Sequence, residues 1–167
     1  MAKPKTPPGC VEIFLRPGEM YFAKENVRIS TLLGSCVSVS CWHPKHHVGG
    51  LSHFLLPDSQ GSTDTGTSGR YANSGFELML SEIRKLGLNN KEFEFKLFGG
   101  GAMPKAASSV HQQIGEKNVA AARQILADFK LTFAAEHTGG IGYRHLMFDI
   151  WSGQVWLKYV ALDGLAD

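Results

Sequence analysis

Cysteine, excess charge of one sign and long apolar runs are all scarce in this sequence. Three cysteines among 167 residues do not make a disulfide framework, so we expect reduced thiols and a cytoplasmic protein. A formal net charge of +2, without a block of Lys and Arg, argues against a nucleic-acid partner. No apolar run reaches the length of a membrane span, and Met1–Lys5 lacks the apolar stretch of a signal peptide, so we expect no membrane insertion.

What is present is the composition of an ordinary globular protein. Hydrophobic residues make up 43% of the chain and charged residues 19%, and the length is sufficient to bury a core. The first ten residues are rich in proline and lysine. They predict a flexible tail over residues 1–10, followed by a single domain over residues 11–167.

Short apolar runs, several of them alternating with polar residues, predict strands in both halves of the chain. The runs cover residues 11–15, 27–33, 37–42, 48–56, 92–98, 131–135, 146–150 and 155–162. The last two are expected to form a hairpin around Ser152-Gly153.

Two segments show helical spacing instead. Apolar residues recur every three or four positions through residues 72–86 and 116–129, which predicts two amphipathic helices. Ser74 and Glu77 fit a capping box at the start of the first helix. Residues 59–70 predict a mobile polar loop, and residues 102–113 look irregular. The order of these elements predicts an α+β fold, or a mixed sheet with helices on one face.

The stretch 30–57 carries the residues of most chemical interest. Cys36 stands before the strand 37–42, and His53 lies in the following strand, seventeen residues later. Two adjacent antiparallel strands would bring this thiol and this imidazole within reach of each other. A thiol beside an imidazole is the minimum requirement for nucleophilic cysteine chemistry.

The residues before Cys36 suit such a nucleophile. Gly34 and Ser35 leave an open backbone, whose N–H groups can form an oxyanion hole. The hydroxyls of Ser30 and Thr31, one strand-length upstream, can orient the imidazole or bind a substrate amide. The competing interpretation is that Cys36 is a buried structural thiol, because cysteine is among the most buried residue types. We interpret Cys41 and Cys10, which lack a preceding Gly-Ser pair, as a packing and a surface thiol.

A metal site and a phosphate loop are both disfavoured by spacing. The potential metal ligands Cys41, His43, His46, His47 and His53 crowd within thirteen positions, but Cys41 and His43 are too close together for a normal ligand pair, His46 and His47 are adjacent, and no C-x-x-C pattern occurs. The glycine clusters at 99–101 and 139–142 lack the ending of a P-loop, and turns explain them better.

Two motifs together resemble the CheD family of chemoreceptor glutamine deamidases. They are T-L-L-G-S-C-V at residues 31–37 and G-G-L-S-H-F-L-L-P at residues 49–57. Further matches occur at Arg70-Tyr71-Ala72, at 96–100 with Met103, at 114–119, at Thr138-Gly139-Gly140 and at Arg144. The resemblance runs from about residue 11 to 160, and the paired motifs are far more specific than any single cluster above.

The resemblance implies a cysteine-dependent protein-glutamine glutaminase, an amidohydrolase that converts selected glutamines of methyl-accepting chemotaxis proteins to glutamate with release of ammonia. It implies that Cys36 is the nucleophile, His53 the general base and Thr31 the third member, with Ser30 as the alternative if the register differs by one. It also implies a three-layer α/β/β sandwich with mixed sheets and two main helices, working without a metal or an organic cofactor.

The resemblance further implies partners and alternatives. The partners are chemoreceptor cytoplasmic domains and, in some organisms, a CheC-type phosphatase. A protein with this sequence can also serve mainly as an adaptor for those partners, or act as a receptor methylesterase through the same thioester. The chain departs from the family pattern at His137, at Gly142-Tyr143 and at Gly101-Ala102, which concerns substrate or partner preference more than the chemistry.

Overall fold

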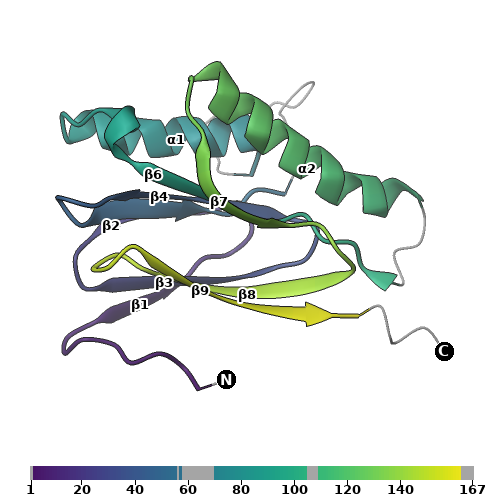
Figure 1. Cartoon of the computed structure of the whole chain (residues 1–167), viewed down its shortest axis with the longest axis horizontal. Coiled ribbons are helices and arrows are strands. Elements are labelled where there is room, and N and C mark those ends of the chain that lie inside the picture. The colour runs from purple at the N-terminus through teal and green to yellow at the C-terminus, as the bar shows by residue number, and fades with distance from the viewer. Residues whose placement is uncertain (1, 56, 58–69, 105–108, 163–167) are drawn as a thin grey trace.

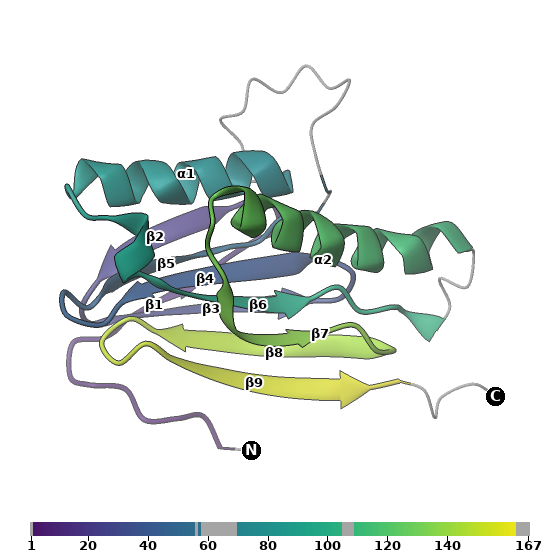
Figure 2. The same ribbon diagram turned by 45° about the horizontal axis from the view of Figure 1, so that its top comes forward.

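Two mixed β-sheets lie face to face, and two helices cover the outer face of one of them (Figure 1). The structure, a computed structural model, describes residues 2–55, 57, 70–104 and 109–162. The layers follow in the order helices, five-stranded sheet, four-stranded sheet, which is also visible in the tilted view (Figure 2). This confirms the α+β fold predicted from the order of the elements and the α/β/β layering that the family resemblance implied.

The four-stranded sheet has the order β1-β3-β8-β9 and the five-stranded sheet the order β2-β5-β4-β6-β7. The four-stranded sheet consists of β1 (Val11–Phe14), β3 (Val27–Leu33), β8 (Gly142–Asp149) and β9 (Gln154–Ala161). The five-stranded sheet consists of β2 (Met20–Lys24), β5 (Val48–Ser52), β4 (Val37–His43), β6 (Glu94–Gly99) and β7 (Phe133–Thr138). The pairs β1–β3 and β6–β7 are parallel, and the others are antiparallel.

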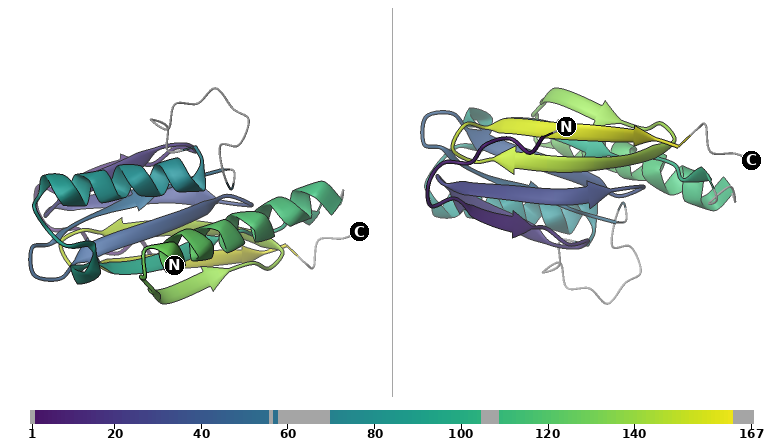
Figure 3. Two further views of the ribbon diagram at one scale, coloured as in Figure 1. Left: turned by 90° about the horizontal axis from the view of Figure 1, so that it is seen from above. Right: turned by 90° about the horizontal axis from the view of Figure 1, so that it is seen from below.

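The helices are α1 (Ala72–Lys85) and α2 (Ser109–Asp128), with a short 3-10 turn η1 (Asn90–Glu92) before β6. Seen from above, α1 lies over β2 and β5, while α2 lies over β4 and β6 (Figure 3, left). Neither described helix is both long and apolar enough to cross a membrane.

The four-stranded sheet carries the N-terminal segment on its outer face (Figure 3, right). Arg28 of β3 is buried there and forms a two-point ion pair with Asp149 of β8, with Nε–Oδ1 and Nη2–Oδ2 distances of 2.6 and 2.9 Å. Its third nitrogen, Nη1, donates to the carbonyl of Pro4 at 2.8 Å. Trp156 of β9 donates to the same carboxylate at 2.9 Å. This network ties the N-terminal segment to three strands.

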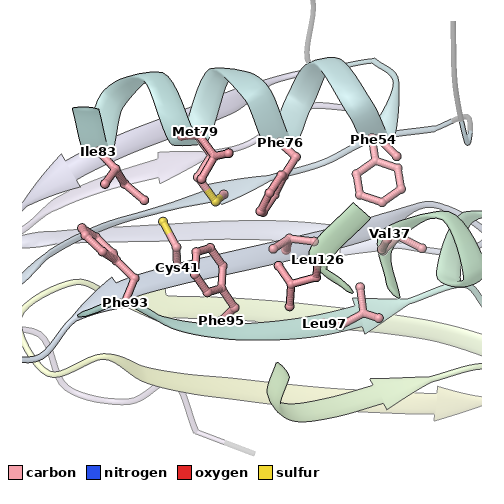
Figure 4. Close-up of a cluster of buried hydrophobic side chains, with 14 of the residues drawn as sticks. Val37, Cys41, Phe54, Phe76, Met79, Ile83, Phe93, Phe95, Leu97 and Leu126 are labelled. Atoms are coloured by element: carbon pink, nitrogen blue, oxygen red, sulfur yellow. The ribbon is translucent and has the colours of Figure 1, made fainter. Parts of the chain in front are cut away.

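Two apolar clusters hold the layers together. The larger lies between the helices and the five-stranded sheet, and includes Val37 and Phe54 together with Phe76 and Met79 of α1 (Figure 4). Cys41, fully buried, belongs to this cluster, as expected for a packing thiol. The second cluster lies between the two sheets and consists of Leu15, Ile29, Leu33, Leu51, Phe98, Leu146, Phe148 and Ile150.

Several element boundaries differ from the prediction. The edge strand β2 was not predicted, because its five residues show no polar alternation and only pairing with β5 defines it. Helix α2 begins at Ser109, earlier than the predicted residue 116. The prediction missed this first part of the helix because its residues are mainly polar and small and show no apolar spacing. Strand β5 ends at Ser52, short of the predicted residue 56. The polar loop predicted at 59–70 lies, except for residue 70, outside the described residues.

The predicted capping box was wrong. Helix α1 takes Tyr71 as its N-cap, without a side-chain cap. Ser74 therefore lies inside the first turn, where its hydroxyl donates to the carbonyl of Tyr71 at 3.3 Å. A hydroxyl that bonds backward to a helical carbonyl is not available as a cap.

Candidate active site

Cys36 and His53 lie on the same face of the five-stranded sheet. Val37, the first residue of β4, and Phe54, just beyond the end of β5, exchange two backbone hydrogen bonds of 3.1 and 3.0 Å. Both of these side chains point into the helix-side core (Figure 4). Side chains alternate along a strand, so Cys36 and His53, each one residue earlier, point toward the other sheet. Cys36 accordingly packs against the inter-sheet cluster.

A hydrogen bond across the two sheets fixes the imidazole of His53. Its Nδ1 lies 2.7 Å from Oγ1 of Thr31 on β3. The same hydroxyl donates its single proton to the carbonyl of Leu15 at 2.8 Å. Oγ1 must therefore accept from Nδ1–H. This leaves Nε2 unprotonated in the neutral ring, which is the form required of a general base.

The free nitrogen of His53 is buried and has no hydrogen-bond partner among the described residues, Cys36 included. Burial is the main reason that the pKa of His53 falls from its ordinary value to about 4. The ring is therefore neutral near neutral pH. A neutral, oriented imidazole with one unoccupied nitrogen can accept a proton from a thiol or from water.

Cys36 is half-buried, and burial raises the pKa of its thiol, although its own backbone N–H acts in the opposite direction. The shifts of Cys36 and His53 both disfavour charge. We therefore expect a resting thiol and a neutral imidazole, rather than a preformed thiolate–imidazolium pair.

The loop before Cys36 is held by its carbonyl groups. The carbonyls of Gly34 and Cys36 accept from the backbone N–H groups of Gly101 and Gly100, at 2.8 and 2.9 Å. Between them, the carbonyl of Ser35 accepts from a side chain of α2 at 3.1 Å. Three consecutive carbonyls, those of residues 34–36, are thus bound by the turn at residues 100–101 and by α2. The N–H groups of Ser35 and Cys36 donate to no carbonyl of another described residue, so they are candidate donors to an oxyanion.

The alternative hydroxyl, Ser30, lies apart from this group. Its neighbour Thr31 points between the sheets, so Ser30 points to the outer face of β3, where its Oγ lies 3.4 Å from the carbonyl of Ile13. The structure therefore brings Thr31, and not Ser30, to His53.

Sequence reasoning missed two contributors to the site. The carbonyl of Leu15, which settles the direction of the Thr31 hydrogen bond, is a backbone group with no sequence pattern of its own. The second is Asn118 of α2, the side chain that bonds to the carbonyl of Ser35. It belongs to the segment 114–119 that resembles the family, but no role followed from its residue type.

His43, the last residue of β4, has a structural role in the β4–β5 turn. Nδ1 of His43 accepts the backbone N–H groups of Lys45 and His46, at 3.2 and 3.3 Å. Within the described part of the chain, no group of three His, Cys, Asp or Glu residues is arranged to hold a metal ion.

Comparison with known proteins points to one family. The model of the family described as CheD chemotactic sensory transduction matches residues 55–159. A protein of Dechloromonas aromatica, named probable chemoreceptor glutamine deamidase CheD 3, is 43% identical over 89% of this chain and 87% of its own length. Probable chemoreceptor glutamine deamidases of Pseudomonas fluorescens and Leptospira interrogans are 38% and 34% identical, over 93% and 91% of this chain and 88% and 95% of their own lengths.

The family model covers more than half of the chain, and the relatives extend the match over the motif around Cys36 as well. The likeness is therefore continuous across both sheets and both helices. On these grounds, the chain belongs to the CheD family.

Proposed function

We propose that this chain deamidates specific glutamine side chains of chemoreceptors through a thioester on Cys36, with His53 as general base and Thr31 as its orienting partner. The observation that carries the proposal is the state of His53, whose Nδ1–H is bound by Thr31 and whose Nε2 is free. The names of the relatives supply the substrate class, since they are described as chemoreceptor glutamine deamidases.

The first half of the reaction forms the thioester. Nε2 of His53 takes the proton of the Cys36 thiol as the sulfur attacks the side-chain amide carbon of the glutamine. The N–H groups of Ser35 and Cys36 bind the oxyanion of the tetrahedral intermediate. His53 then gives its proton to the departing nitrogen, and ammonia leaves as the thioester forms.

The second half of the reaction restores the enzyme. Nε2 of His53 takes a proton from a water molecule, which attacks the thioester carbon. The carbon–sulfur bond breaks, the thiolate recovers the proton, and glutamate is released. Each step uses only groups of this chain and water.

The position of the enzyme in the cell follows from its substrate. Receptor glutamines of this kind lie on cytoplasmic domains, so we place the protein in the cytoplasm, acting as one domain over residues 11–167. We also propose a CheC-type phosphatase as a second partner. Cys36 is half-buried rather than sealed in the core like Cys41, which favours an enzyme over a pure adaptor.

Mass spectrometry of a receptor cytoplasmic domain tests the proposal. The wild-type chain should convert particular glutamines to glutamates, with one ammonia released for each, and Cys36→Ala should abolish both. Cys10→Ala, which removes a thiol far from the site in sequence, serves as the control and should retain activity. Full ammonia release by Cys36→Ala would contradict the proposal. Release of methanol rather than ammonia by the wild-type chain would identify a receptor methylesterase instead.

A further inference from the structure

Asn118 is a buried polar side chain that touches both halves of the proposed active site. It lies on α2 with an exposed fraction of 0%. Its Nδ2 donates to the carbonyl of Ser35 at 3.1 Å and to the carbonyl of Leu55 at 2.9 Å. Ser35 immediately precedes Cys36, and Leu55 follows His53 by two residues. One amide group therefore joins the segment of the nucleophile to the segment of the base.

We propose that Asn118 is a positioning residue that sets the separation between Cys36 and His53. This inference rests on the roles given to those two residues above. The backbone pairing between the two segments ends at Val37 and Phe54, and the next N–H, that of Leu55, turns away to the carbonyl of residue 70. Beyond that pair, no backbone hydrogen bond among the described residues joins the segment before Cys36 directly to the segment after His53. The side chain of Asn118 supplies a direct link between them.

Helix α2 is well placed to hold this amide still. Gly115, one turn before Asn118, lies so close to the 99–101 turn that a Cβ there would come within 2.5 Å of the carbonyl oxygen of Gly100. On the far side of Asn118, Val119 also packs against Gly100 and belongs to the helix-side core. The helix face that carries Asn118 thus contacts the same turn that binds the carbonyls of Gly34 and Cys36.

The unpaired atom of Asn118 indicates that stability alone does not explain this residue. Its Oδ1 is buried and has no hydrogen-bond partner among the described residues. A buried acceptor without a partner costs free energy, and Nδ2 is fully used by the two carbonyls. Burial of Oδ1 therefore costs free energy of folding, while Nδ2 joins the segment of Ser35 to the segment of Leu55. That pattern fits a device for positioning the reacting groups rather than a simple packing residue.

Kinetics of Asn118→Ala on a receptor cytoplasmic domain test the inference. The change removes both hydrogen bonds, and misplacement of reacting groups by about 1 Å can cost on the order of 100-fold in rate. We expect kcat to fall by roughly 10- to 100-fold. KM should stay nearly unchanged, because Asn118 is buried and its substitution leaves the surface that would bind the receptor as it is. The rate of thioester formation in a single turnover should fall in parallel.

Leu126→Ala is the matched control. Leu126 is buried in the same apolar cluster, but it lies two turns further along α2, away from the two carbonyls that Asn118 binds. Its truncation should lower the melting temperature at least as much as Asn118→Ala, while kcat at a temperature where both variants are folded stays near wild type. If Asn118→Ala does not fold, Asn118→Ser, which keeps one donor, replaces it and should give an intermediate kcat.

The outcomes separate this inference from the proposed chemistry. A folded Asn118→Ala with wild-type kcat overturns the inference, and so does an equal loss of kcat in Asn118→Ala and Leu126→Ala. A lowered kcat confined to the Asn118 variants supports it. Ammonia release by Cys36→Ala, measured in the same assay, would instead overturn the proposed function, whatever Asn118 does.

Discussion

His53 shows how a single buried side chain acquires its chemical state from its neighbours. The Leu15 carbonyl can only accept a hydrogen bond, so it takes the proton of Thr31, and Thr31 in turn must accept from His53. The relay fixes the tautomer of a ring that carries no charge. A serine at the position of Thr31 would offer the same hydroxyl with less constraint on its rotamer.

Removal of the Thr31 hydroxyl tests this relay. Thr31→Val keeps the shape of the side chain but leaves Nδ1 of His53 without its partner, so the ring can adopt the wrong tautomer. We expect kcat to fall on the order of 10- to 100-fold, as part of the roughly 100- to 10,000-fold that general base catalysis contributes. Ser30→Ala, on the outer face of the same strand, should have little effect. Equal rates for Thr31→Val and wild type would contradict the relay.

Burial of His53 also predicts how stability depends on pH. The pKa of His53 is about 4 in the folded protein, against 6.5 as its ordinary value. Between these values the unfolded chain binds the additional proton, so the stabilisation is complete above pH 6.5 and is lost as the pH falls toward 4. This loss amounts to about 3 kcal/mol in the free energy of unfolding. Urea unfolding of wild type and His53→Gln at several pH values should show the steeper acid loss in wild type.

At the scale of elements, α2 lies close against the Gly99–Gly101 turn, which is hydrogen-bonded to the segment around Cys36. Gly100 adopts a φ of +67°, and a Cβ there would lie 2.4 Å from Cγ2 of Val119 and 2.8 Å from the carbonyl oxygen of Gly115. Only glycine meets both demands at this position. The same turn donates backbone hydrogen bonds to the carbonyls of Gly34 and Cys36.

Gly100→Ala and Gly87→Ala form a matched pair that separates backbone strain from this close approach. Gly87, after α1, has a nearly identical φ of +68°, but a Cβ added there would have no described atom within 4 Å. We expect Gly87→Ala to cost about 1 kcal/mol through its backbone conformation alone and to leave activity intact. Gly100→Ala should cost a further 1–3 kcal/mol, roughly, through overpacking, and should reduce kcat. Identical effects of the two changes on activity would rule out the role of the turn.

The sequence predicted these elements unevenly, for physical reasons. The strands with alternating residues and the apolar faces of both helices were recognised because burial imposes a period on them. The start of α2 was missed because residues 109–115 are mainly polar and small. Cys36 and His53 were predicted from their residue types and, with Thr31, from the family resemblance; the structure places Thr31 against His53, and the three catalytic roles stay a prediction. The bridge formed by Asn118 was not predicted, because its partners are two backbone carbonyls that any sequence possesses.

At the scale of the whole molecule, the four-stranded sheet is stabilised by a polar network on its outer face, the face opposite to the candidate active site. Arg28, Asp149 and Trp156 join β3, β8 and β9 on the outer face. The carboxylate of Asp149 accepts from both other side chains. A buried charge pair of this kind contributes most visibly when one partner is lost.

Asp149→Asn tests this fastening. The amide cannot neutralise the buried guanidinium of Arg28, so the free energy of unfolding should fall by roughly 3–5 kcal/mol. Glu82→Gln, at the exposed ion pair with Lys85 on α1, is the control and should change it by less than about 0.5 kcal/mol. Urea unfolding measures both. Because Arg28 points away from the inter-sheet layer, the residual folded Asp149→Asn should keep its kcat, and a large loss there would contradict the separation of the two regions.

The hydrogen bond between Thr31 and His53 has a consequence for how this fold tolerates change. His53 and Thr31 lie on different sheets, so, under the proposed mechanism, the thickness of the apolar layer between the sheets sets the distance between the base and its orienting hydroxyl. Substitutions at Leu51 or Phe148 that increase or decrease the thickness of this layer should therefore lower kcat, as substitutions of the reacting residues do. Neither side chain needs to contact a receptor for this effect. Substitutions in the apolar layer between the sheets are then limited by their effect on catalysis as well as by their effect on folding.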